Sequence, residues 1–126
     1  MGVVRVKAGV QFTTIAPGGF RILAGLDNVC RTLPFDFVIT SACDGEHSGP
    51  VDPHHRGEAY DVRSHDLPDK EAILGLLKKV LEETYFFFFL EDEGSSNEHI
   101  HIQVRKGTIY PSNDSEEVSD AALGAN

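Results

Sequence analysis

Two short segments of the chain carry side chains that can bind a metal ion. The first, residues 54–61, begins with His54 and ends with Asp61, and the second, residues 98–101, reads Glu-His-Ile-His. Imidazole and carboxylate groups are ligands that zinc accepts. Two ligands from the first segment and a histidine from the second leave the fourth zinc position open for water. That arrangement is typical of a catalytic zinc site rather than a structural one.

Each segment alone has a simpler interpretation. On a strand, His99 and His101 share one face, and two exposed polar side chains on an edge hairpin would explain them equally well. His54 alone could be an ordinary loop histidine, as could His47, and His65 is expected at the surface. The two segments together favour metal binding, because a mixed sheet can bring a loop and a hairpin arm to the same place.

The elements that must position these residues follow from the apolar periodicity. Alternation predicts strands over residues 4–12, 35–40 and 57–63, and helical spacing predicts helices over residues 20–33 and from Asp66 and Pro68 to residue 81. Residues 17–19 are expected to break the chain, residues 41–53 form a long loop, and residues 85–90 and 100–104 form a hairpin. The sequence therefore predicts an α+β domain over residues 1–110, with a mixed, largely antiparallel sheet of about five strands and two helices. An acidic tail over residues 111–126 is expected to fray.

Composition narrows the classes of function. The chain has 126 residues, a formal charge of −9, 40% hydrophobic and 25% charged residues, as in ordinary globular domains. The negative charge argues against nucleic acid as a partner, and no apolar run approaches the length of a membrane span. The N-terminus lacks a secretory signal, which predicts cytoplasmic synthesis. Cys30 and Cys43 are expected to be free and at least partly buried.

The residues of the first segment also carry a family resemblance. The spacing His54-x-x-Gly57-x-Ala59-x-Asp61 resembles the metal motif of zinc D-Ala-D-Ala carboxypeptidases and dipeptidases, a group that includes phage endolysins. The N-terminal signalling domain of hedgehog proteins shares their fold. The likeness covers about residues 35–105 and implies that His54, Asp61 and His101 bind Zn²⁺. A side chain at Gly57 would crowd the turn that brings the first two ligands together.

A zinc peptidase also needs a general base that accepts a proton from the metal-activated water. Glu98 stands at the spacing seen in the dipeptidases, although on a regular strand it would face away from His101. Glu91 stands where hedgehog domains have a comparable glutamate, and it faces His101 if the hairpin loop has an odd number of residues. We favour Glu98 over Glu91, with His99 as an auxiliary that acts as a base or stabilises the oxyanion.

The sequence departs from the peptidase pattern at three places. The peptidases usually carry an arginine just after the serine that opens the long loop, whereas residues 41–44 read Ser-Ala-Cys-Asp and are more like the hedgehog version. Asp52 replaces a serine and His55 replaces a tyrosine. Arg56 or Arg63 could substitute for the missing arginine in space.

Three functions follow from these observations. The first is a zinc peptidase that hydrolyses short peptides, above all peptidoglycan stem peptides ending in D-amino acids. Such an enzyme would be a phage endolysin released to the cell wall or a cytoplasmic recycling peptidase of bacteria. The second, favoured by the missing arginine, is a hedgehog-like module that holds zinc and binds a partner without hydrolysis. The third is a metal-free interaction domain. The sequence leaves the exact substrate and the oligomeric state open.

Overall fold

The computed structural model describes residues 1–43, 53–54 and 56–105, and within them the chain forms two helices and five strands. In chain order they are β1 (Val4–Val6), α1 (Pro17–Cys30), β2 (Phe37–Ser41), β3 (Ala59–Arg63), α2 (Lys70–Leu81), β4 (Phe86–Glu91) and β5 (His99–Val104). The strands form one sheet in the order β1-β2-β3-β5-β4. The predicted α+β class, with two helices and a mixed five-stranded sheet, is confirmed.

The sheet is mixed, and its description as largely antiparallel needs correction. β1 runs parallel to β2, with Val4 opposite Phe37, whereas the other three pairings are antiparallel. The parallel pair arises because α1 lies between the two strands in the chain, and a helical crossover returns the chain in the original direction.

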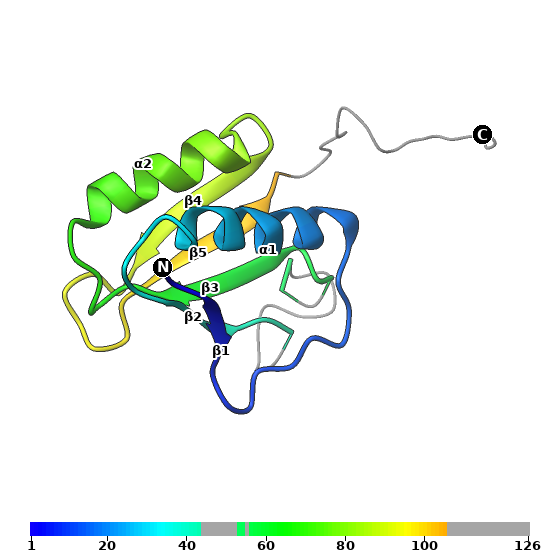
Figure 1. The fold of residues 1–126 in the computed structure, drawn as a ribbon. Helices are drawn as coiled ribbons and strands as arrows, with labels where there is room; N and C mark the ends of the chain where they lie inside the picture. Colours follow the sequence, from blue (N-terminus) through cyan, green and yellow to red (C-terminus); the bar gives the residue numbers. More distant parts are fainter. Residues whose placement is uncertain (44–52, 55, 106–126) are drawn as a thin grey trace.

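Both helices lie on one face of the sheet (Figure 1). α1 packs against β1, β3 and β5, and α2 packs against β4 and α1. The core between the helices and the sheet is formed by buried apolar side chains, among them Ile22, Leu26, Ile39, Tyr60, Val62, Ile73, Leu77, Phe86, Ile100 and Ile102. The opposite face of the sheet is therefore available for polar side chains.

Strand alternation distributes the side chains of β5 between these two faces. Ile100, Ile102 and Val104 are buried toward the helices, whereas His99, His101 and Gln103 are half-buried on the opposite face. β5 lies between β3 and β4. The β4–β5 hairpin thus lies at the edge of the sheet, as the simpler interpretation assumed, but the two histidines are on its inner strand and are partly buried rather than exposed.

Several element boundaries differ from the prediction, and three of them have consequences for the fold. The first strand ends at Val6 rather than residue 12. Pro17 is the first residue of α1 instead of part of a break, because proline fits the first helical turn, where its missing N–H has no partner to lose. α2 begins at Lys70, after Pro68, because the Asp69 carboxylate accepts a hydrogen bond from Ala72 N (3.3 Å) and caps the helix there.

The structure also tests the predictions about the cysteines and about a membrane span, whereas some other predictions concern residues that it does not describe. Cys30 and Cys43 are free and buried, as predicted. Neither described helix is long and apolar enough to span a membrane. Residues 44–52, residue 55 and residues 106–126 lie outside the described part, so the predicted positions of His47, Asp52 and His55 and the fraying of the acidic tail do too.

Candidate metal centre

The sheet places Asp61 and His101 side by side. Asp61 lies in β3 directly opposite His101 in β5, on the face away from the helices. His54 reaches the same place from the turn before β3, and its side chain is only 5% exposed. The structure thus brings together the three residues that the resemblance implied as zinc ligands.

A glycine packed against the N-terminal segment holds the turn that carries His54. Gly57 has φ +71°, and a Cβ there would lie 2.2 Å from the carbonyl oxygen of Thr14. Gly57 O accepts a hydrogen bond from Ala16 N (3.2 Å), and His54 O accepts one from Gly57 N (3.1 Å). The crowding predicted at this glycine is present, and the neighbour that causes it is the segment before α1.

The three candidate ligand atoms lie close to the separations that a tetrahedral zinc ion requires. His54 Nε2 lies 3.3 Å from His101 Nδ1 and 3.4 Å from Asp61 Oδ1, and His101 Nδ1 lies 2.9 Å from the same oxygen. Nitrogen and oxygen ligands about 2.0–2.1 Å from a tetrahedral zinc lie about 3.3–3.4 Å from one another. Two of the three separations match this value, and the third needs to open by about 0.4 Å.

Hydrogen bonds on the far side of each ring orient the two imidazoles. His54 Nδ1 lies 2.9 Å from the carbonyl oxygen of Ala42, and His101 Nε2 lies 2.7 Å from Gln103 Oε1. An oxygen of either type accepts a hydrogen bond, so each neutral ring can carry its proton on this far nitrogen when a metal ion takes the near one. The other nitrogen of each ring then directs a lone pair toward Asp61. In that tautomer two lone pairs and a carboxylate oxygen converge, which is a donor set that can hold a metal ion.

The pKa values of Asp61 and His101 shift in opposite directions, as expected for a carboxylate and an imidazole that form an ion pair. Burial alone would raise the pKa of Asp61, but hydrogen bonds and charge from His101 and His54 outweigh it and lower the pKa below its ordinary value. Burial alone would lower the pKa of His101, but hydrogen bonds with Asp61 and Gln103 and the charge of Asp61 raise it. Without metal, these shifts favour a protonated His101 beside an ionised Asp61.

Glu91 and His99 lie in the next row of the same sheet face. Glu91 is opposite His99 in the β4–β5 pairing, and Oε1 of Glu91 lies 2.8 Å from His99 Nε2. His99 Nε2 also lies 3.8 Å from Asp61 Oδ2. The seven residues between β4 and β5 are an odd number, which is the condition under which Glu91 was expected to face the metal ligands.

The Glu98 carboxylate lies away from the metal ligands, against Lys70 and Ser64. This position does not suit a general base, the role for which the sequence favoured Glu98. The residue is 1% exposed, and its carboxylate binds Lys70 Nζ (2.7 Å), Ser64 Oγ (2.9 Å) and the backbone N–H of Gly94 (3.1 Å). The hydrogen bond with Lys70 is the main reason that the pKa of Glu98 is lowered. Its contacts fasten the hairpin loop to the start of α2. The sequence alone gives no sign that Lys70 and Ser64 approach it.

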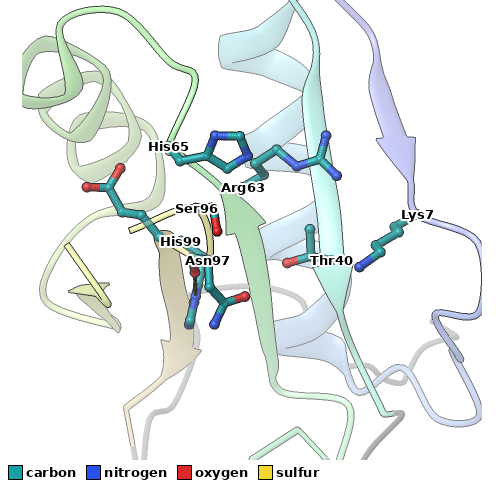
Figure 2. Close-up of a pocket in the computed structure, with 8 residues that line it drawn as sticks. Lys7, Thr40, Arg63, His65, Ser96, Asn97 and His99 are labelled. Carbon is teal, nitrogen blue, oxygen red and sulfur yellow. Dashed lines mark hydrogen bonds between the residues drawn. The ribbon is translucent and has the colours of Figure 1, made fainter. Parts of the chain in front are cut away.

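Two basic side chains line a cavity beside His99. The cavity has a volume of about 110 Å³, and Lys7, Thr40, Arg63, His65, Ser96, Asn97, Glu98 and His99 line it. In Figure 2, Lys7 and Arg63 extend over β2, while Asn97 and His99 come from the hairpin on the other side of β3. Among the described residues, no carboxylate forms an ion pair with Lys7 or Arg63. Sequence reasoning named Arg63 but missed Lys7.

The structure also places two other candidate residues from the sequence, Arg56 and His65. Arg56 forms an ion pair with Glu58 (2.8 Å) next to the His54 turn. His65 is exposed, as expected, although it borders the cavity. Gln103 and the carbonyl of Ala42 were missed. A polar residue two positions after His101 on the same strand face was the available signal for Gln103.

Comparison with known proteins adds nothing to these observations. No protein-family model, curated protein sequence or solved structure matches the chain.

Proposed function

We propose that the protein is a zinc-dependent peptidase that hydrolyses short peptides, with peptidoglycan stem peptides ending in D-amino acids as its substrate class. The observation that carries this proposal is the convergence of His54 Nε2, Asp61 Oδ1 and His101 Nδ1 at 2.9–3.4 Å from one another. The donor set suits zinc, because two imidazoles and one carboxylate leave one tetrahedral position for water or substrate. Zinc bound there would polarise a carbonyl group and lower the pKa of a bound water.

Glu91 is the residue best placed to accept the proton of the attacking water. Its carboxylate is 49% exposed, lies on the face of the metal ligands and forms no ion pair with lysine or arginine among the described residues. Glu98, in contrast, is buried against Lys70. This assignment reverses the order of the two glutamates that the sequence favoured.

His99 would stabilise the oxyanion that forms when water attacks the peptide carbonyl. Burial alone would lower its pKa, but the hydrogen bond with Asn97 and the carboxylates of Asp61 and Glu91 raise it. The ring is therefore protonated more readily than a free histidine. A protonated imidazole beside the ligands can donate a hydrogen bond to negative charge that develops on the substrate.

Lys7 and Arg63 would hold the carboxylate end of the substrate and take the place of the missing loop arginine. Arg63 lies two residues after Asp61 on one strand face, which corresponds to about 7 Å along the strand. A terminal carboxylate lies about one residue, or about 3.8 Å, beyond the scissile carbonyl. The difference between these two lengths is about the length of one hydrogen bond or one metal–ligand contact. One peptide could therefore place its scissile carbonyl at the metal and its terminal carboxylate in the cavity.

The alternative is a hedgehog-like module that contains zinc and binds a partner without hydrolysis. The absence of an arginine from residues 41–44 favours it. Zinc analysis of the purified protein and incubation with peptidoglycan and D-Ala-D-Ala peptides separate the two functions. Bound zinc with cleavage that Glu91→Gln abolishes supports the peptidase. Bound zinc with no cleavage supports the binding module, and no bound zinc excludes both.

A further inference from the structure

The carboxylate of Asp61 faces two different groups of ligands. Its Oδ1 lies beside His54 and His101, whereas its Oδ2 lies 3.8 Å from Nε2 of His99. That nitrogen lies 2.8 Å from Glu91 Oε1. One ligand atom each from Asp61, Glu91 and His99 lies within 4.8 Å of the others, separately from the first group.

The ring of His99 is oriented in the same manner as that of His54. Its Nδ1 lies 2.8 Å from the carbonyl oxygen of Asn97. A carbonyl oxygen can only accept a hydrogen bond, so Nδ1 carries the proton that it donates. Nε2 then faces two carboxylates, either with a second proton or with a lone pair available to a metal ion. A backbone carbonyl that fixes the far nitrogen is the usual outer contact of a metal-binding histidine.

We infer that Asp61, Glu91 and His99 form a second site for a divalent cation, with Asp61 bridging it to the first. One imidazole and two carboxylates suit zinc and other first-row divalent metals. The donor separations of 2.8 and 3.8 Å lie on either side of the roughly 3.3 Å expected for tetrahedral zinc. Glu91 is the most exposed of these ligands and can adjust.

The second site should be weaker than the first. Both imidazoles of the first site are held at their far nitrogens, and all its ligands are at most 13% exposed. In the second site, Glu91 is 49% exposed, so ordering its side chain costs conformational entropy. The two cations would also repel each other, and the shared carboxylate offsets this repulsion only in part.

Binding of a second ion would inhibit hydrolysis. The ion would displace the Nε2 proton of His99 to solvent and bind the carboxylate of Glu91. It would remove the proton acceptor and the oxyanion donor together. This consequence rests on the proposed function, whereas the existence of the second site does not.

Equilibrium dialysis against zinc, with metal analysis and circular dichroism, tests the second site. The wild-type chain should bind two equivalents, one tight and one weak. Glu91→Gln and His99→Ala should each lose the weak equivalent and keep both the tight one and the native spectrum. His65→Ala, which removes an exposed histidine outside both groups, should keep two.

Different results of this experiment would overturn the second site, both metal sites or the inhibitory role. A single equivalent in the wild-type chain that disappears in His101→Ala would overturn the second site and leave the first intact. Persistence of the weak equivalent in both Glu91→Gln and His99→Ala would also overturn it, because the ion would then bind elsewhere. No zinc in the wild-type chain would overturn both proposals. In the wild-type enzyme, cleavage should be lost as the second equivalent binds, and unchanged cleavage would overturn the inhibitory role.

Discussion

Asp61 lies directly opposite His101 across the β3–β5 pairing, and its Oδ1 is 2.9 Å from the Nδ1 of that histidine. Both side chains project from interior strands, so the hydrogen-bonded pairing of these strands fixes their separation. Only His54 comes from a turn, and Gly57 and the hydrogen bond to Ala42 hold it. A centre built in this way is preorganised, because most of its geometry belongs to the sheet.

Removal of a ligand from the first site should abolish tight zinc binding. We expect His101→Ala to weaken zinc binding by more than about 100-fold, since even outer-shell changes cost about 10–100-fold. Competition with a chromophoric zinc chelator measures this change. His65→Ala is the matched control, because His65 is exposed, and equal affinities of the two variants would exclude His101 as a ligand.

Gln103 should matter for zinc affinity although it is not a ligand. Its Oε1 holds the far nitrogen of His101 at 2.7 Å, and loss of such a contact lets the ring turn and change tautomer. We expect Gln103→Ala to weaken zinc binding about 10–100-fold while the fold persists. Gln103→Glu keeps an acceptor at this place and should retain affinity, so comparable losses in both variants would contradict the orienting role.

Gly57 should be far less tolerant of substitution than Gly94. Both have positive φ values, +71° and +85°, but a Cβ at Gly57 would lie 2.2 Å from Thr14 O, whereas a Cβ at Gly94 has no neighbour within 4 Å. Gly94→Ala should cost about 1 kcal/mol from backbone strain alone. Gly57→Ala should cost about 1–3 kcal/mol more, because the backbone must also move.

Urea denaturation of the metal-free proteins compares the two variants. The metal-free state isolates the packing effect, because zinc would otherwise add its own binding energy to the stability. Zinc affinity should fall in Gly57→Ala and stay unchanged in Gly94→Ala. Equal losses of stability would show that the segment around Thr14 does not constrain the His54 turn.

Glu98 should be required for stability and not for metal binding. We expect Glu98→Gln to melt at a lower temperature, because Lys70 then loses a charged partner for its ammonium group. Its zinc stoichiometry should equal that of the wild-type chain. Thermal melts with metal analysis measure both quantities, and loss of zinc with an unchanged melting temperature would return Glu98 to the metal centre.

The sequence predicts the elements that carry the site better than the contacts that complete it. Periodicity identifies β3, β5 and the hairpin, since apolar alternation reflects burial against the helices. The parallel pairing of β1 was missed, because strand neighbours depend on how α1 packs rather than on local pattern. The exchange of Glu98 for Glu91 has a similar cause. The spacing seen in the dipeptidases favoured Glu98, but the strand pleat and Lys70 turn its carboxylate away from the metal ligands.

The metal-free protein should lose stability as pH rises through the pKa of His101, whereas zinc binding should strengthen over the same range. The pKa of His101 is raised in the folded state, so its contribution is fully present below the unfolded value of about 6.5 and disappears above the folded pKa. The pKa of Asp61 is lowered, so its contribution is present above about 3.9 and is lost as pH falls. Metal-free stability should therefore peak between about pH 4 and 6.5.

Zinc requires neutral imidazoles, so its affinity should rise with pH. Urea denaturation from pH 4 to 8, with and without zinc, tests both trends. His101→Ala should flatten the pH profile of the metal-free stability, and an unchanged profile in that variant would show that another group carries the dependence.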